Sequence, residues 1–310
     1  MIYTVTVNPA MDTVLALDTK LRPGEVNRSK DETIYCGGKG LNVSFVLSEL
    51  GHSSRALGFV AGSMGRMIEN DVRSKGIQAD FIHLPAGESR VNVKIRGVYG
   101  RITQINGAGP AATEEAAEEL FRKLDAVEDG DVLVLSGSLL PNMGDDFYAR
   151  ILSRVSDRNV MTVVDAEGAA LETALAYRPF LIKPNLKELS ALFVTPLNGD
   201  EEIFRCAEAL QRKGARNVLI SMAEGGALFL EENGKRHRIG VAEGKERYSV
   251  GAGDAMVAGF IAGYLDRGTF GYALRLGTAC GGATAFSDGL ARSEEIGRVF
   301  ETLAGEDIEK

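Results

Sequence analysis

The stretch Ser249-Val250-Gly251-Ala252-Gly253-Asp254-Ala255-Met256 places two glycines before a carboxylate, and an apolar run over residues 256–263 follows at once. A glycine turn that opens a helix presents unpaired backbone N–H groups at the positive end of the helix dipole. Such a helix start can hold an anion, typically a phosphate. Asp254 would lie in the first turn, where its carboxylate can accept a proton from an attacking hydroxyl. The segment therefore predicts phosphoryl transfer; the simpler alternative is a glycine-rich loop with an acidic helix start.

The composition is that of a globular protein without a basic surface. The 310 residues are 45% hydrophobic and 25% charged, as in soluble domains. A formal charge of −8 argues against nonspecific nucleic-acid binding, which needs a basic face. Three cysteines without a CxxC spacing predict neither a disulfide framework nor a zinc site, and a reducing cytoplasm is the expected setting. We expect no membrane span, because no run of 18 apolar residues occurs.

Short apolar strands alternate with amphipathic helices along most of the chain. We expect strands at 2–7, 56–60, 132–135, 160–164, 180–182 and 218–221, and helices at 40–50, 64–75, from Thr113 onward, and at about 201–213. This alternation predicts an α/β fold whose mostly parallel sheet is covered on both faces.

Two segments, 13–35 and 89–106, break this rhythm with β-like alternation. In Val91-Asn92-Val93-Lys94-Ile95 the apolar side chains point one way and the polar ones the other, which suits a small sheet with a solvated face. We therefore expect these segments to form a β lid over a main domain made of residues 1–12, 36–88 and 107–310.

A second glycine turn, Gly37-Gly38-Lys39-Gly40-Leu41-Asn42-Val43, also opens a predicted helix. Its glycines let a ligand approach the backbone, and Lys39 and Asn42 can bind hydroxyls or phosphate. The Walker A spacing is absent, and no GxGxxG follows the first strand, which counts against a dinucleotide-binding dehydrogenase. An ordinary helix entry is the alternative. Asp12, after the first strand, suits sugar binding and turn stabilisation about equally.

The remaining candidate ligands are basic residues that could bind a phosphate and residues that could bind a nucleotide or its metal. Arg28, Arg90 and Lys94 lie on the expected lid strands, where a phosphate can be bound, although each alone more often meets water. Asn185 and Glu188 share a helix face and can hold Mg²⁺ through water, but an Asn cap explains Asn185 nearly as well. The turn at 221–226 suits a nucleotide or any hairpin.

Taken together, these segments resemble the carbohydrate kinases of the ribokinase-like (PfkB) family, from Asn8 to about Gly289. The motifs occur in the family's order: Asn8-Pro9-Ala10-Met11-Asp12, Gly37–Val43, Arg90-Val91-Asn92-Val93-Lys94, Ile105-Asn106-Gly107-Ala108-Gly109-Pro110, Gly137-Ser138-Leu139, Lys183-Pro184-Asn185 and Val250–Asp254. The set resembles the branch that phosphorylates ketohexose phosphates. Within it, Val26–Ser29 and Val164–Gly168 look most like the 1-phosphofructokinase group, with tagatose-6-phosphate kinases as the close rival.

The resemblance implies a ribokinase-like α/β/α fold with a small β lid, and ATP-dependent phosphorylation of fructose 1-phosphate at O6 with Mg²⁺. Asp254 would be the base, and the N–H groups of Gly251, Ala252 and Gly253 the anion hole. Implied sugar-phosphate ligands are Asp12, Arg28, Gly37, Gly38, Lys39, Asn42, Arg90 and Ser138. Implied nucleotide ligands are Lys183, Asn185, Ser221, Met222, Ala223, Glu224, Gly225, Gly226, Gly253 and Asp254, with Glu188 near the metal through water. A homodimer through the lid strands is implied as well.

Alternatives remain open at this point. The acceptor can be tagatose 6-phosphate, fructose 6-phosphate or another hexose phosphate. A noncatalytic sugar-phosphate sensor on the same fold is a more distant alternative, and the presence of Asp254 with its glycine turn argues against it. Glu167 and Cys36 depart from the common family pattern and are given no ligand role; Cys36 is expected to be a packed thiol.

Overall fold

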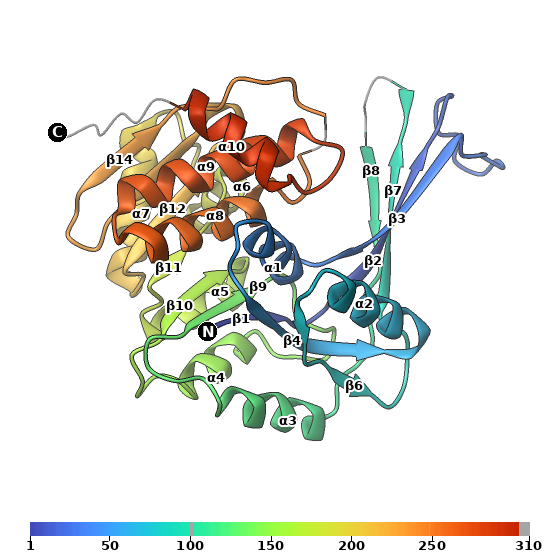
Figure 1. The fold of residues 1–310 in the computed structure, drawn as a ribbon, viewed down its shortest axis with the longest axis horizontal. Coiled ribbons are helices and arrows are strands. Elements are labelled where there is room, and N and C mark those ends of the chain that lie inside the picture. Colours follow the sequence, from blue (N-terminus) through green and yellow to red (C-terminus); the bar gives the residue numbers. More distant parts are fainter. Residues whose placement is uncertain (99–101, 248, 304–310) are drawn as a thin grey trace.

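The computed structural model describes residues 1–98, 102–247 and 249–303. Within these residues, the strands form a ten-stranded sheet and a separate four-stranded sheet (Figure 1). The strand order of the large sheet is β14-β13-β12-β11-β10-β9-β1-β4-β5, with β6 also paired to β4. The strands from β12 to β5 are parallel to their neighbours, whereas β13 and β14 form an antiparallel edge. The predicted α/β fold with a mostly parallel sheet is confirmed.

The strands of the large sheet coincide with the short apolar runs of the sequence. They are β1 (Ile2–Thr6), β4 (Ser54–Ala61), β5 (Gln78–Ala79), β6 (Ile82–Leu84), β9 (Val132–Ser136), β10 (Met161–Asp165), β11 (Leu181–Ile182), β12 (Asn217–Ser221), β13 (Ala227–Leu230) and β14 (Arg236–Ile239). Leu133 and Leu135 of β9 point into one hydrophobic cluster, and Val132 and Val134 into another. Both faces of the sheet are therefore covered, as continuous apolar runs predict.

Helices form the two outer layers. Their bounds are α1 (Lys39–Glu49), α2 (Gly62–Ser74), α3 (Glu114–Leu124), α4 (Phe147–Ser153), α5 (Gly168–Ala174), α6 (Leu186–Phe193), α7 (Asp200–Lys213), α8 (Ala252–Arg267), α9 (Phe270–Phe286) and α10 (Ser293–Thr302). Apolar residues of α3 to α7 share one cluster, and those of α1, α8, α9 and α10 share the cluster on the opposite face. Among the described residues, no helix is long and apolar enough to cross a lipid bilayer.

The small sheet projects from the large one (Figure 1) and has the order β3-β2-β7-β8. Its strands are β2 (Ala10–Ala16), β3 (Asp31–Gly37), β7 (Arg90–Arg96) and β8 (Ile102–Asn106). Because β2 begins at Ala10 and β3 continues to Gly37, Asp12 and Gly37 lie in this sheet and not in the ranges expected for the main domain. The division into two domains stays a prediction, and its parts at 99–101, 248 and 304–310 lie outside the described residues.

The burial of the small sheet differs from the expected solvated polar face. Asn92 and Lys94 are only 9% and 3% exposed, while Val91 and Ile105 on the opposite face are 39% and 60% exposed. One reason is that Asn92 and Lys94 both donate hydrogen bonds to the Asp12 carboxylate. The small sheet thus has a buried polar face and an exposed apolar face.

Candidate active site

Side chains from separate segments meet at the carboxyl end of the large sheet. Asp165 ends β10, Lys183 follows β11, Lys39 and Asn42 lie in the first turn of α1, and Asp254 lies in the first turn of α8. Carboxyl ends of parallel strands share one edge of a sheet, so the topology brings these segments together. The residues predicted for the base and the sugar loop therefore occupy one site.

The start of α8 has the geometry expected for an anion-binding turn. Gly251 precedes the helix with a φ of 87°, a left-handed conformation that favours glycine, and no side chain caps the helix. A Cβ on Gly253 would lie 3.3 Å from the Lys183 Nζ, so an ammonium group stands directly beside the helix start. The Ala252 N–H donates to the Ser249 carbonyl at 3.2 Å, so this amide of the predicted anion hole already has a partner. Amide dipoles and an ammonium together form a positive region that suits a phosphoryl group.

Asp254 is buried at this helix start, with 7% of its surface exposed. The Asn42 Nδ2 donates to its Oδ2 at 2.7 Å. Burial and the nearby Asp165 raise the pKa of Asp254 to about 7, against the Asn42 hydrogen bond and the ammonium groups of Lys39 and Lys183, which lower it. A carboxyl group with a pKa near neutrality is well matched to accept a proton from a hydroxyl.

Asp165 is a site residue to which the sequence analysis gave no role. Its side chain is buried, its Oδ1 accepts a hydrogen bond from the Lys39 Nζ at 3.3 Å, and the Lys183 Nζ lies 3.6 Å from the same oxygen. Burial raises the pKa of Asp165, but the two ammonium groups outweigh it and hold that pKa below its usual value. The signal that could have found it is an Asp at the end of a predicted buried strand, adjacent to the strand that precedes Lys183.

Lys39 is held by carboxylates. Its Nζ also lies 3.7 Å from the Oε1 of the more exposed Glu167. Burial lowers the pKa of Lys39, yet Asp165 and Asp254 raise it above the ordinary lysine value, so the group stays protonated. Lys39, Asp165 and Lys183 thus form a partly buried ion cluster, which we call the Lys-Asp-Lys cluster.

The residues predicted to bind nucleotide lie at the same edge of the sheet. Asn185 pairs with Ser221 in an isolated parallel bridge, and the Ser221 N–H donates to the Pro184 carbonyl at 3.2 Å. Residues 222–226 form the turn between β12 and β13, with the Met222 N–H donating to the Gly226 carbonyl at 2.9 Å. A Cβ on Gly226 would lie 2.1 Å from a backbone oxygen of Ile239, so only glycine fits there.

Asn185 and Glu188 form a capping box at the start of α6. The Glu188 N–H donates to the Asn185 Oδ1 at 2.9 Å, and the Asn185 N–H donates to the Glu188 Oε2 at 2.9 Å. The alternative of an Asn cap is therefore confirmed. Burial raises the pKa of Glu188 above its ordinary value, against the Asn185 N–H and the ammonium groups of Lys39 and Lys183, which lower it. Because Glu188 interacts with both ammonium groups, its carboxyl group also belongs to the site.

The fit of a metal ion depends on these carboxylates. The described residues contain no group of three or more His, Cys, Asp or Glu side chains arranged to hold a metal. Nucleotide-bound Mg²⁺ commonly keeps several waters and takes only one or two carboxylates from the protein. Glu188, near the Lys-Asp-Lys cluster, is compatible with such a contact through water.

The residues predicted to bind the sugar lie on β2 and in the glycine turn before α1. Asp12 is 6% exposed, and a Cβ on Gly37 would lie 2.6 Å from its Oδ2, so the turn lies against this carboxylate. Gly38 has a φ of 134°, and a Cβ there would lie 2.8 Å from the Thr6 Cγ2. Both glycines are therefore required for the close approach of the turn to β1 and β2.

The predicted phosphate ligands are only partly brought together. Arg90 begins β7, and its buried Nε has no hydrogen-bond partner in the part of the chain described. Ser138 is exposed in the loop after β9. Arg28 is exposed in the loop between β2 and β3, so its expected place on a lid strand is wrong. Lys94, expected near the phosphate, is paired with Asp12 at 2.6 Å instead.

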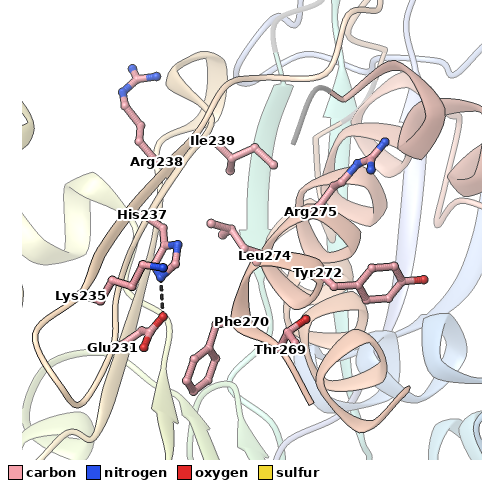
Figure 2. A pocket seen from close by; sticks show the side chains of 11 residues that line it. Glu231, Lys235, His237, Arg238, Ile239, Thr269, Phe270, Tyr272, Leu274 and Arg275 are labelled. Carbon is pink, nitrogen blue, oxygen red and sulfur yellow. Dashed lines mark hydrogen bonds and ion pairs between the residues drawn. The ribbon is translucent and has the colours of Figure 1, made fainter. Parts of the chain in front are cut away.

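A separate cavity of about 500 Å³ lies between the β13–β14 hairpin and the first turns of α9 (Figure 2). His237 and Glu231 form a hydrogen bond on one side, and Phe270 and Leu274 of α9 line the other. None of the predicted site residues lines it. The candidate active site is defined instead by its convergent charged side chains.

Comparison with known proteins gives the family. The model of the family described as pfkB family carbohydrate kinase matches residues 1–296. The chain belongs to the pfkB family of carbohydrate kinases. The 1-phosphofructokinase of Bacillus subtilis is 39% identical over 296 residues, which is 96% of each chain. The crystal structure of phosphofructokinase-2 from Escherichia coli in complex with substrates and products superposes with a TM-score of 0.91 at 25% identity, covering 97% of this chain and 99% of that one.

Relatives within the pfkB family are named for different sugars. The D-tagatose-1-phosphate kinase of Bacillus licheniformis is also 39% identical, over 292 residues and 94% of each chain. Overall identity therefore does not choose between the two sugars, and the choice must come from side chains at the site.

Proposed function

We propose that this pfkB kinase transfers the γ-phosphoryl group of ATP to O6 of fructose 1-phosphate, giving fructose 1,6-bisphosphate. The observation that carries the proposal is the buried Asp254, whose pKa is raised to about 7, at the uncapped glycine start of α8 beside Lys183. The similarity to a 1-phosphofructokinase and to a D-tagatose-1-phosphate kinase, each over nearly the whole chain, supports a ketohexose 1-phosphate as the acceptor.

In this mechanism, each group has a defined task. Asp254 takes the proton of the 6-hydroxyl as O6 forms its bond to phosphorus and the bond from phosphorus to the ADP oxygen breaks. The amides of Gly251 and Gly253, with the ammonium groups of Lys183 and Lys39, stabilise the charge on the transferring group. Because the Lys-Asp-Lys cluster is in place beforehand, little reorganisation accompanies the step. Asp12, Gly38 and Asn42 orient the sugar, and Arg90 holds its phosphate.

A divalent metal, which we propose to be Mg²⁺, accompanies the nucleotide. Glu188 would hold the metal through water, and the charge of the metal would offset that of the phosphates. The turn at 221–226 and Asn185 line the nucleotide pocket in this proposal.

A coupled assay of ADP formation tests the function. Fructose 1-phosphate, tagatose 1-phosphate, tagatose 6-phosphate and fructose 6-phosphate are compared by kcat/KM at fixed Mg·ATP. We expect the highest value for fructose 1-phosphate. A higher kcat/KM for either tagatose phosphate would show that this sugar, and not fructose 1-phosphate, is the preferred acceptor. Absence of ADP with every sugar would favour the noncatalytic sensor.

The raised pKa of Asp254 predicts a pH dependence of catalysis. The base works only when ionised, so the rate at substrate concentrations well below both KM values, which reports the pKa of the free enzyme, should rise with pH, reach half its limit near pH 7, and level off above it. The measurement is this rate from pH 5.5 to 8.5. A rate that is constant across pH 6 to 8 while chemistry limits it would contradict the assignment.

We also propose that the protein forms a homodimer through the lid. Ile34 and Ile105, 58% and 60% exposed, lie in one row across the small sheet, because Ile34 pairs with Thr13, Thr13 with Val93, and Val93 with Ile105. Exposed apolar rows of this kind favour association with a complementary surface.

Charges on that row are expected to prevent dimerisation. Ile34→Glu combined with Ile105→Glu should convert a dimer to a monomer in sedimentation-velocity experiments, because two carboxylates per subunit would be buried at the interface. Leu265→Glu is the matched control, since Leu265 is 41% exposed near the end of α8. A wild-type protein that is monomeric at micromolar concentration would refute the dimer.

A further inference from the structure

A buried polar network on the small sheet is only partly explained by the proposed function. The Asp12 Oδ1 accepts a hydrogen bond from the Asn92 Nδ2 at 2.8 Å, and its Oδ2 accepts one from the Lys94 Nζ at 2.6 Å. Lys94 also donates to the Tyr35 hydroxyl at 3.2 Å. Asp12, Asn92 and Lys94 are each 9% exposed or less, and Tyr35, the fourth member of the network, is half-buried.

The network fixes the orientation of the Asn92 amide. A carboxylate paired with an ammonium group can only accept hydrogen bonds, so the Asn92 NH₂ group must face Asp12. The Asn92 Oδ1 is therefore directed away from Asp12. This oxygen is buried and has no hydrogen-bond partner within the described residues.

A buried acceptor without a donor is costly, and native proteins rarely leave one unsatisfied. The Asn92 Oδ1 therefore needs a donor from outside the described chain. A sugar hydroxyl can supply it, because hydroxyls donate as well as accept.

The strand register places Asn92 beside Asp12 and near Arg90, the residues proposed to bind the sugar phosphate. Asp12 and Asn92 are direct neighbours on β2 and β7, on the same face of the sheet. Arg90 lies two residues earlier on that face, roughly 6.6 Å along the strand, and its Nε is likewise buried without a partner. The Arg90 Nε, an unpaired cationic donor, and the Asn92 Oδ1, an unpaired acceptor, thus lie near each other on one face of the sheet. The first could bind the phosphate of a ligand and the second a hydroxyl of the same ligand.

We infer that Asn92 is a specificity-determining residue that accepts a hydrogen bond from a ring hydroxyl of the ketohexose phosphate held at Asp12. Lys94 is a positioning residue, because it acts on the sugar only through Asp12. The inference rests on the proposed function, and it adds a residue that distinguishes ketohexose phosphates by the configuration of one hydroxyl. Fructose and tagatose differ in the configuration of one hydroxyl, the kind of difference that a buried acceptor can detect.

The expected magnitude follows from the unpaired acceptor. A site built to bind a hydroxyl discriminates strongly against an analogue that lacks it, because a buried polar group is then left unpaired. We expect the wild-type kcat/KM to fall by about 10²-fold or more for whichever of 3-deoxy- and 4-deoxyfructose 1-phosphate lacks the hydroxyl bound by Asn92.

The experiment combines this substrate change with Asn92→Ala. With fructose 1-phosphate, Asn92→Ala should lower kcat/KM by about 10- to 10³-fold. The penalty for removing the decisive hydroxyl should shrink to about threefold or less, because its acceptor is already gone. A merely structural role of Asn92 would lower kcat/KM for all sugars alike and leave this penalty unchanged.

Gln104→Ala is the matched control, since Gln104 is exposed on the neighbouring strand opposite Lys94. It should leave both kcat/KM and the deoxy penalty at wild-type values. Thermal unfolding and ADP binding of each variant report whether it is folded. Should Asn92→Ala not fold, the wild-type deoxy series decides: a fall of less than fivefold for both analogues overturns the inference.

The failures are distinguishable. A wild-type enzyme active on fructose 1-phosphate, combined with an undiminished deoxy penalty in folded Asn92→Ala, overturns the inference alone. A wild-type protein that phosphorylates no ketohexose phosphate overturns the proposed function, and the inference with it.

Discussion

Asp254→Asn is expected to lower kcat by about 10²–10⁴-fold, the usual worth of a general base. The amide cannot accept the proton of the sugar hydroxyl, yet it has nearly the size of the carboxyl group and can keep a hydrogen bond with Asn42. The fold and the affinity for nucleotide should therefore be retained. Single-turnover kinetics at saturating fructose 1-phosphate and Mg·ATP measure the effect on the chemical step.

Asp266→Asn provides the control for this experiment. Asp266 lies in the last turn of the same helix, and its side chain is 48% exposed. It should retain wild-type turnover. Turnover of Asp254→Asn within about threefold of wild type would remove Asp254 from the role of base, whatever the sugar preferred by the enzyme.

Asp165→Ala is expected to be the most destabilising change at the site, lowering the free energy of unfolding by about 3–5 kcal/mol. The substitution removes the carboxylate between the ammonium groups of Lys39 and Lys183, of which Lys183 is 4% exposed. Two like charges then remain close together with little solvation. Urea unfolding at neutral pH measures the loss, and kcat should fall as well because the ammonium groups are no longer held in place.

Glu167→Gln tests whether the stabilising effect of a carboxylate beside Lys39 depends on its burial or only on its distance from the ammonium group. Glu167 lies 3.7 Å from the same Lys39 ammonium group, but its side chain is 67% exposed. Exposed ion pairs contribute about 0–1 kcal/mol, so this variant should unfold almost as the wild type does. Equal losses for Asp165→Ala and Glu167→Gln would contradict the importance assigned to the buried cluster.

The strands and helices could be predicted because their signals are local. Residues 132–135 are a run of buried aliphatic residues, and Thr113 caps α3 by accepting a hydrogen bond from the Ala116 N–H. The turns at Gly251 and Gly38 were recognisable because a left-handed backbone favours glycine. The motif order was also enough to point to the family before any geometry was known.

The sequence does not predict which face of the small sheet is buried, for a physical reason. Alternation in β7 correctly separates Asn92 and Lys94 from Val91, but alternation does not say which face meets solvent. That depends on β2 lying beside β7 in a register that sets Asp12 opposite Asn92, and register is a property of paired strands. A buried Lys can be satisfied only once its partner is known.

The chain alone predicts the elements, the glycine turns and the role of Asp254 as the base, since each prediction depends on neighbours within a few residues. Only the tertiary structure shows that Asp165 forms ion pairs with both Lys39 and Lys183. It also shows that Asn42 donates a hydrogen bond to Asp254 and that Lys94 forms an ion pair with Asp12. These contacts join residues 82 to 212 positions apart or cross between neighbouring parallel strands. Their strength depends on burial, which arises only when the sheet and its helices have come together.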